Sequence, residues 1–591
     1  MSATPGISDV DKTICDNLLF NRTADPVAEF AAHFRSKKPG KKKKSGADLP
    51  LDERLANYIV EGTKDGLTND LDLKLKEAKP LEIINGPLMA GMDEVGRLFN
   101  DNKLIVAEVL QSAEAMKAAV AHLEPYMEVN ETSSRGKVLL ATVKGDVHDI
   151  GKNLVDIILS NNGFEVINLG IKVPPQSLIE AIEKHNPDIV GLSGLLVKSA
   201  QQMVITASDF AEAGIKTPII VGGAALSEGF VDKRISTAYA TGTVAYAPDA
   251  MKGLELAKSI VDPAAFESLK SRLTERRAAA AAKIQQEGPR TVATVSTERS
   301  AKVDILSDIP APPDFERHLL LGKTPIDQIW KFINPMMLYG RHLGVRGKVV
   351  RLLNEVSERP AVKKEIEALD PKAFSIWESV EGIKNEYRSS RQMRSAAVYQ
   401  FFKAYAKGNT IHFMRPDGSE EAMEFPRQSK NPNYCLADFV SPDPAKADNI
   451  GVFAVTVGDG IREEAEKLKN AGDYLRSHIL QALALESAEG YAEFLHAQMR
   501  RMWGFGDPPE TSMLERYQAK YRGKRYSFGY PACPRLSDQE RLFALLRPEE
   551  IGIQLTDGFM MDTEASVTAL VFHHPQAAYF SVGQTEDSDD T

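Results

Sequence analysis

Between residues 51 and 127 the apolar positions recur every three or four residues, which is the spacing of one face of an α-helix. Phe99 and Val106 follow this spacing, and the polar pair Asp101 and Asn102 interrupts it. Four helices are expected, over roughly 51–65, 68–78, 80–100 and 103–125. Consecutive short helices that each carry one apolar face predict a small antiparallel bundle.

From residue 136 to residue 262 the pattern changes to short apolar runs, each followed by a helical stretch. Strands are expected at 138–143, 165–169, 188–192, 218–221 and 243–245. Helices are expected at 152–161, 175–185, 199–213, 227–234 and 248–260. Alternation with connections of this length implies right-handed crossovers, so we predict a doubly wound, flavodoxin-like parallel sheet.

The last part of the chain mixes both patterns without regular alternation and predicts a separate α+β domain. Its expected strands are 397–402, 410–414, 451–458, 567–572 and 578–583, and its long helices are 461–472, 474–503 and 537–546. Before it, a charged, alanine-rich helix (269–286) and a Ser/Thr-rich stretch are typical of a linker. The expected divisions are 1–50, 51–130, 131–262, 263–305 and 306–591.

The first fifty residues combine one amphipathic helix, Ile14 to Phe34, with a lysine run from Lys37 to Lys44 that contains proline and glycine. Such a run is typical of a solvated linker, and a patch for an anionic surface is the alternative.

Composition narrows the class of protein. A chain of 591 residues is too long for one hydrophobic core. The net charge of -10 gives no support for nucleic-acid binding, so no nucleic-acid partner is expected. The three cysteines, Cys15, Cys435 and Cys533, are too few and too scattered for a disulfide framework and indicate a reducing compartment. Neither a signal peptide nor a membrane-spanning run is found, so we expect a cytoplasmic protein without a membrane partner.

Candidate chemistry is concentrated in the segment from Gly145 to Asn153, which joins the apolar run 138–143 to a helix. Open α/β sheets bind ligands at such a loop, at the carboxyl end of a strand. His148, with Asp146 two residues before it, has the form of a metal ligand whose second ring nitrogen is held by an acid. The alternative is an ordinary solvated or internally bonded histidine.

Small residues follow two more strands of the predicted sheet, at Gly191–Gly194 and Gly222–Ala224. Glycine permits close backbone approach to a ligand. Because three strand ends on one edge of the sheet carry such features, we expect a ligand site there, with ordinary tight turns as the alternative.

A further unusual segment is the loop from Arg525 to Pro534, in which two prolines and a glycine surround aromatic residues. Proline and glycine at these positions force an irregular, extended loop. An arginine there can hold a carboxylate by a bidentate contact, although a purely structural loop is the alternative.

The series Asp146-x-His148-x-x-Gly151, Ser193-x-Leu195 and Gly222-Gly223 resembles the cobalamin-binding signature of corrinoid methyltransferases and mutases. The helical bundle before it resembles the cap of the methyltransferase branch. The last domain resembles the S-adenosylmethionine-binding reactivation domain of the cobalamin-dependent methionine synthases. The segments that carry this second resemblance are Asn433–Phe439, Gly529–Pro534 and the expected terminal strand around Tyr579.

The resemblance implies that His148 is the lower axial ligand of cobalt, that Asp146 orients it and that Ser199 completes a proton relay. It implies further corrinoid contacts at Asn85, Phe99, Val106, Gly145, Val147, Asp149, Gly151, Ser193, Leu195, Val197, Gly222, Gly223 and Ala250. Of these, Phe99 and Val106 would cover the upper face from the cap. Asn85, Val106 and Val197 depart from the residues usual in the family, which are glutamate, leucine and threonine.

In the last domain the resemblance implies that Arg525 holds the carboxylate of S-adenosylmethionine and that Glu489 lies near its cationic end. Further contacts are implied at Asn334, Gly529, Tyr530, Tyr579 and Phe580. Asn334 stands where the family has aspartate, and Phe580 where it has tyrosine.

The function that the resemblance implies is that of a methionine synthase component. It would carry methyl from methyltetrahydrofolate to homocysteine via methylcobalamin, and would remethylate cob(II)alamin with S-adenosylmethionine after one-electron reduction. No cysteine pair suited to a homocysteine-binding zinc is present, and Met1 stands where the folate module would end. The expectation is therefore the second subunit of a split enzyme, with a homocysteine- and folate-binding partner chain and a flavodoxin-like electron donor. The alternatives are a fragment, a stand-alone corrinoid methyl carrier, a cobalamin-sensing regulator or a structural protein that needs no cobalamin.

Overall fold

The computed structural model describes residues 49–127, 134–286, 296–355, 361–388, 390 and 392–582. The expected helix 14–34 and the lysine run lie outside the described residues. Among the described helices we find none with the length and apolar character of a membrane span.

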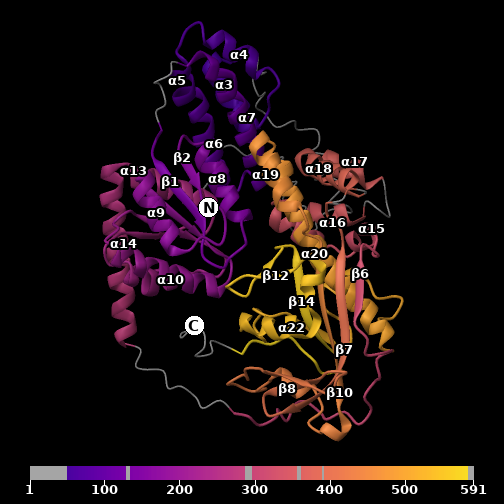
Figure 1. The fold of residues 1–591 in the computed structure, drawn as a ribbon. Helices are drawn as coiled ribbons and strands as arrows, with labels where there is room; N and C mark the ends of the chain where they lie inside the picture. Colours follow the sequence, from indigo (N-terminus) through magenta and orange to yellow (C-terminus); the bar gives the residue numbers. More distant parts are fainter. Residues whose placement is uncertain are drawn as a thin grey trace, which may run out of the picture.

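A helical bundle forms the first described part of the chain (Figure 1). Its elements are α3 (Leu51–Glu61), α4 (Leu67–Lys74), α5 (Pro80–Ile83), η2 (Ile84–Leu88), α6 (Met89–Asn100), α7 (Val106–Leu123) and the short η3 (Glu124–Tyr126). The four predicted helices are confirmed, with α5, η2 and α6 as one continuous run. Gly91 lets α6 cross α3 closely, since a Cβ there would lie 2.7 Å from the carbonyl oxygen of Ala56.

The next part is an α/β unit around a five-stranded parallel sheet in the order β2-β1-β3-β4-β5. Its strands are β1 (Lys137–Thr142), β2 (Glu165–Asn168), β3 (Ile189–Ser193), β4 (Ile219–Gly222) and β5 (Val244–Tyr246). Its helices are α8 (Ile150–Ser160), α9 (Pro175–His185), α10 (Val197–Glu212), α11 (Glu228–Phe230), η4 (Val231–Ile235), α12 (Ser236–Ala238) and α13 (Ala250–Val261). The predicted doubly wound sheet is confirmed. Because the strand order reverses between β1 and β3, their carboxyl ends form the crevice in which such sheets bind ligands.

The helix predicted over 269–286 is confirmed as α14 (Pro263–Gln286), which begins six residues earlier and lies against α13. Leu269 and Leu273 are buried, one helical turn apart. Arg276 pairs with Asp232 through two hydrogen bonds of 2.8 Å. Leu269, Leu273 and Arg276 therefore fix the helix on the α/β unit, although the alanine-rich sequence around them did not indicate this contact.

The C-terminal domain is built on an antiparallel sheet of order β11-β14-β10-β7-β8-β9, with β6 also paired to β7. Its strands are β6 (His318–Leu321), β7 (Ala396–Lys407), β8 (Thr410–Met414), β9 (Glu420–Glu424), β10 (Asp448–Thr456), β11 (Lys524–Tyr526) and β14 (Ser566–Phe572), and the separate pair is β12 (Gln554–Leu555) and β13 (Met561–Asp562). Its helices are α15 (Ile326–Trp330), η5 (Met336–His342), α16 (Gly347–Glu355), α17 (Val362–Leu369), α18 (Pro371–Tyr387), η6 (Leu436–Phe439), η7 (Pro444–Lys446), α19 (Ile461–Ala471), α20 (Tyr474–Met502), α21 (Met513–Tyr517), η8 (Leu536–Asp538), α22 (Gln539–Leu546) and η9 (Pro548–Ile551).

The long helix α20 and the shorter α22 cover opposite faces of this sheet. Phe453 and Val455 of β10 share a hydrophobic cluster with α20. Val452 and Ala454, which alternate with them, share a second cluster with α22. The period of two along the strand therefore divides the core into two layers.

The strand predicted at 578–583 is wrong for its described part, because residues 578–582 form no strand. β11 ends the sheet beside β14, and the 578–582 segment does not pair with it. It crosses the Arg525 loop instead, where the backbone N–H of Val582 donates to the carbonyl of Pro531 (3.1 Å).

The bundle contacts the C-terminal domain through α7. Ala107 and Leu110 belong to the same hydrophobic cluster as α20. Glu114 accepts a hydrogen bond from the backbone N–H of Leu475 (2.9 Å), in the otherwise uncapped first turn of α20. Lys117 donates to the carbonyl of Asn470 at the end of α19 (2.9 Å). Each charge thus complements the dipole of the helix end that it meets.

Candidate functional site

The loop after β1 presents His148 at the carboxyl edge of the parallel sheet. Asp146 lies beneath it, fully buried, and its Oδ1 is 2.6 Å from Nδ1 of the imidazole. The other carboxylate oxygen accepts hydrogen bonds from the hydroxyl of Ser199 (2.5 Å) and the backbone N–H of Leu195 (2.8 Å). The structure thus joins His148, Asp146 and Ser199 in one hydrogen-bonded series.

The hydrogen bonds of this series shift the pKa values of both Asp146 and His148. Burial opposes charge on both groups, but the hydrogen bonds from His148 and Ser199 hold the pKa of Asp146 below its usual value. The carboxylates of Asp146 and Glu564 outweigh the burial of His148 and raise its pKa. A neutral imidazole bonded in this way carries its hydrogen on Nδ1. Its Nε2 has no hydrogen-bond partner among the described residues, which leaves a lone pair for a ligand.

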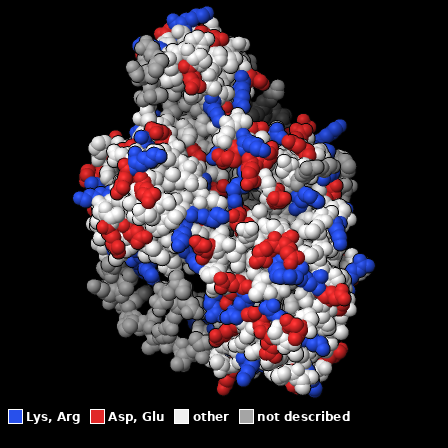
Figure 2. Space-filling view, in the orientation of Figure 1, with Lys and Arg blue, Asp and Glu red and all other residues white. Residues whose placement is uncertain are grey.

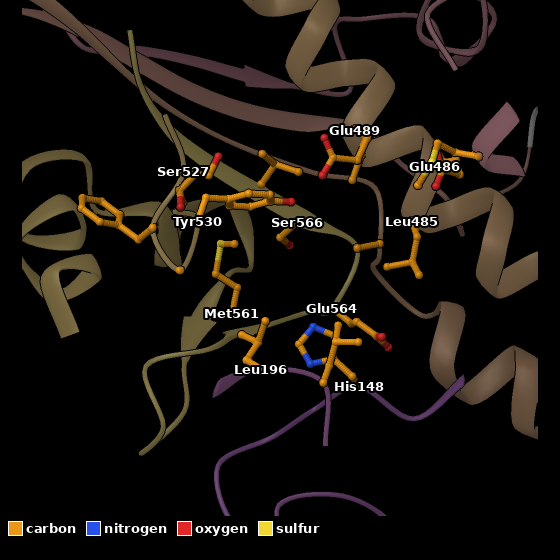
Figure 3. A pocket seen from close by; sticks show the side chains of 18 of the residues that line it. His148, Leu196, Leu485, Glu486, Glu489, Ser527, Tyr530, Met561, Glu564 and Ser566 are labelled. Atoms are coloured by element: carbon orange, nitrogen blue, oxygen red, sulfur yellow. The ribbon is translucent and has the colours of Figure 1, made fainter. Parts of the chain in front are cut away.

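His148 lies at a cavity of about 940 Å³ between the α/β unit and the C-terminal domain. Figure 3 shows His148 and Leu196 on one wall, with Glu489 and Tyr530 across from them. The predicted site residues that line it are His148, Gly151, Leu195, Val197, Asn334, Glu489, Arg525, Gly529, Tyr530 and Tyr579. Two sites predicted separately, one in each part of the chain, therefore open into a single cavity.

Large hydrophobic side chains are unusually exposed around this cavity. Leu195, Val197, Tyr530 and Tyr579 line it with 38%, 58%, 58% and 56% of their surface accessible. Exposed apolar residues that converge on a cavity, rather than being scattered, mark a ligand surface.

Arg525 enters this cavity from β11 and meets two carboxylates of α20. Glu493 makes a close ion pair with it, while Glu489 is 3.6 Å away. Burial alone would lower the pKa of Arg525, but the charge of Glu493 raises it. The guanidinium is therefore permanently charged and held at the cavity wall.

Several predicted contacts lie away from the cavity. Asn85, Phe99 and Val106 belong to the bundle, and none of them lines it. Val106 instead packs near Gly344 of the C-terminal domain, where an added Cβ would lie 3.3 Å from the backbone nitrogen of Val106. The bundle therefore leaves the site open toward the C-terminal domain instead of covering it.

Phe580 does not line the cavity, because its ring packs against Tyr434, Phe439 and Tyr526 at the border of a hydrophobic cluster. The remaining predicted residues support the loops without lining the cavity, and these are Gly145, Asp146, Val147, Asp149, Ser193, Ser199, Gly222, Gly223 and Ala250. At the end of β4, a Cβ on Gly223 would lie 1.7 Å from the carbonyl oxygen of Gly194, so this close approach requires glycine.

A hairpin of the C-terminal domain, β12 to β13, docks on the His148 loop. The hydroxyl of Thr556 donates to the carbonyl of Gly145 (2.7 Å). Asp562 pairs with Lys172 (2.6 Å). Gly558 lies directly on the backbone of Gly145, where a Cβ would come within 2.9 Å of its carbonyl oxygen. Figure 2 shows charged side chains of both signs along the boundary between the two parts.

Glu564 and Glu493 are charged residues that line the cavity and were not predicted from the sequence. Glu564 follows the hairpin and lies beside His148 at the cavity, and burial raises the pKa of its carboxyl to about 7. No sequence signal connects it to His148, because only the tertiary fold brings the two together. Glu493 could have been found, since it follows Glu489 by one helical turn on the same face of α20.

Three family models match the chain. Residues 51–124 and 136–254 each match a family described as a B12 binding domain. Residues 327–590 match the family described as vitamin B12 dependent methionine synthase, activation domain. These ranges contain the helical bundle, the parallel sheet and the Arg525 loop respectively.

Among curated proteins, the chain is similar to two methionine synthases. That of Mycobacterium tuberculosis (strain ATCC 25618 / H37Rv) is 36% identical over 98% of this chain and 50% of that protein. That of Mycobacterium leprae (strain TN) is 35% identical over 91% of this chain and 46% of that protein. The chain spans about half the length of these relatives.

Among solved structures, the chain is similar to a crystal structure of the MetH reactivation domain bound to AdoHcy. The identity is 27% and the TM-score is 0.43, over 49% of this chain and 91% of that chain.

Proposed function

We propose that this chain, which carries the B12 binding domains and the activation domain of vitamin B12 dependent methionine synthase, is the cobalamin-carrying and reactivation component of such an enzyme. It is a cobalamin-dependent methyltransferase component that carries methyl from methyltetrahydrofolate to homocysteine. The observation that carries the proposal is that His148 and Arg525, from two different matched domains, line the same cavity.

The residues around His148 suit a corrinoid. Nε2 is free to bind cobalt, Nδ1 is anchored on a buried carboxylate, and exposed Leu195 and Val197 offer an apolar surface beside it. When bound, cobalamin supplies a cobalt centre that accepts and gives up a methyl group. His148 would hold the cobalt through Nε2, and Asp146 and Ser199 would share the proton of its Nδ1.

The opposite wall suits S-adenosylmethionine. Arg525 holds the carboxylate of its amino-acid end, and Glu489 faces the cationic groups. Gly529, Tyr530, Tyr579 and Asn334 complete this wall. A methyl donor bound there would face His148 across the cavity, and these residues would place its methyl group toward a corrinoid held by His148.

The helical bundle takes a second position during turnover. In its present position Phe99 and Val106 lie away from the cavity, and α7 is anchored on the C-terminal domain through Glu114 and Lys117. We infer that the same bundle covers the corrinoid when S-adenosylmethionine is not being used. Movement between these positions limits turnover, because the two arrangements exclude one another.

The other reactants come from partners. A separate chain supplies the homocysteine and folate sites, and a flavodoxin-like protein supplies the electron for reactivation. The proposed division is a cap over 51–130, a cobalamin domain over 131–262 that α14 extends, and a reactivation domain over 306–591. The buried, unpaired Cys435 and Cys533 fit a reducing, cytoplasmic location.

The chain alone, loaded with cobalamin, is expected to make no methionine from methyltetrahydrofolate and homocysteine. Adding the homocysteine- and folate-binding half of a related methionine synthase is expected to start turnover. Methionine is measured by chromatography, with the partner half alone as the control. Methionine formation by the purified chain alone would contradict the need for a partner. A stand-alone corrinoid carrier, the alternative function, would bind cobalamin but not S-adenosylmethionine.

A further inference from the structure

Helix α20 carries a line of ionisable side chains through the centre of the C-terminal domain. Glu486, Glu489, Glu493, His496 and Arg500 follow one another at intervals of three and four residues and so share one face of the helix. Most of them are buried, with His496 and Arg500 at 0% exposure and Glu493 at 7%. Buried charges are costly unless they are paired, so their partners indicate what the line is for.

The two carboxylates that meet Arg525 are held very differently. Glu493 makes the close ion pair, and the same oxygen, Oε2, also accepts a hydrogen bond from the hydroxyl of Tyr521 (3.1 Å). Its other oxygen lies 3.6 Å from Arg500, which is itself fixed by two hydrogen bonds of 2.8 Å to Asp507. Glu493 is therefore enclosed on both sides by anchored groups.

Glu489 has no such support. Its side chain is 48% exposed, its nearest contact with Arg525 is 3.6 Å, and it faces the cavity. A guanidinium has five donors in a planar fork and can bind two carboxylates at once. When a third carboxylate arrives from the cavity, the partner with the longer and more exposed contact is the one that leaves.

We propose that Glu493 is a positioning residue, the permanent partner that presents Arg525 to the carboxylate of S-adenosylmethionine, while Glu489 is the partner that the ligand displaces. The displaced Glu489 is then free to face the ligand's ammonium and sulfonium groups. This inference rests on the proposed function and goes beyond it, because it assigns separate roles to two acids of one helix.

The test compares two adenosine ligands that differ at the amino-acid end. S-adenosylhomocysteine has the carboxylate, and 5′-methylthioadenosine lacks the whole amino-acid group. In Glu493→Gln, Arg525 loses its fixed partner and turns to Glu489, so it is withheld from the ligand. Calorimetry on the full chain is expected to show about 10- to 100-fold weaker binding of S-adenosylhomocysteine. Binding of 5′-methylthioadenosine is expected to stay within about twofold of the wild type.

Two control variants separate this role from a general effect. Glu381→Gln changes an acid of α18 that pairs with Lys384 (2.8 Å) and does not line the cavity, and it is expected to leave both affinities unchanged. Glu489→Gln is expected to weaken S-adenosylmethionine more than S-adenosylhomocysteine, because only the former has a sulfonium. Glu493→Gln is expected to weaken S-adenosylmethionine and S-adenosylhomocysteine by the same factor, because both carry the carboxylate.

The outcomes decide between the alternatives. If Glu493→Gln keeps the wild-type preference for S-adenosylhomocysteine over 5′-methylthioadenosine, the positioning role is wrong. The same holds if it weakens S-adenosylhomocysteine and 5′-methylthioadenosine by the same factor. If the wild-type chain shows no preference for S-adenosylhomocysteine over 5′-methylthioadenosine, the proposed binding of S-adenosylmethionine is contradicted, and with it the roles assigned here to Glu493 and Glu489. Should Glu493→Gln not fold, Tyr521→Phe removes only the hydroxyl that anchors Glu493. That variant is expected to weaken S-adenosylhomocysteine several-fold and to spare 5′-methylthioadenosine; equal affinities to the wild type would overturn the proposal.

Discussion

Replacing His148 with glycine leaves cobalamin bound to the chain but gives it the absorption spectrum of a corrinoid without an imidazole below the cobalt. The apolar wall of Leu195 and Val197 remains, whereas the only group that we place as the axial ligand is gone. Added imidazole is expected to enter the vacated space and restore the ligated spectrum. Absorption spectroscopy of the loaded variant, with and without imidazole, measures both effects.

The matched variant is Asp146→Asn, which keeps the imidazole and removes the charge that orients it. The contact between Nδ1 of His148 and the carboxylate is 2.6 Å, so its loss weakens axial ligation by about 10- to 100-fold without abolishing it. A His148→Gly spectrum identical to that of the wild type would remove His148 from the axial role.

Gly558→Val is expected to slow methyl transfer from S-adenosylmethionine to the corrinoid by about one to two orders of magnitude. A Cβ at this position would lie 2.9 Å from the carbonyl oxygen of Gly145 and 3.1 Å from its Cα, and backbone atoms cannot rotate away. Overpacking of this kind costs about 1–3 kcal/mol, all of it in the arrangement in which the hairpin docks on the His148 loop. Binding of cobalamin and of S-adenosylhomocysteine separately is expected to stay unchanged.

The control is Gly382→Val, an exposed glycine of α18 where an added Cβ meets no atom within 4 Å. Single-turnover methyl transfer and calorimetric binding are measured for both variants. If Gly558→Val transfers methyl at the wild-type rate, the hairpin does not control the approach of the two domains.

Helices and strands could be predicted wherever the apolar residues follow a single spacing, either that of one helix face or that of a buried strand. The change from helical spacing to strand–helix alternation near residue 136 predicted a doubly wound parallel sheet, and its strand order β2-β1-β3-β4-β5 came from the structure. The loop bearing His148 followed from its place after a buried strand. Its partnership with Ser199 came from a resemblance and required the fold to bring the two residues together.

The position of the helical bundle could not be read from the sequence. The apolar face of α7 predicts that the helix packs against another element but does not identify that element. In the structure, Ala107 and Leu110 pack against the C-terminal domain. Glu564 was missed for a related reason, since a single acid after a hairpin has no local pattern. Residues 578–582 show the converse, since they have the apolar pattern of a strand but do not join the sheet.

The central claim is that this chain remethylates its own corrinoid with S-adenosylmethionine. The chain is loaded with cobalamin, reduced electrochemically and mixed with S-adenosylmethionine labelled in its methyl group, and the label on the cobalamin is counted. We predict close to one labelled methyl per bound cobalamin, with the label absent in Arg525→Ala, which lacks the carboxylate contact. No labelled cobalamin in the wild-type chain, at saturating S-adenosylmethionine and complete reduction, would contradict the account.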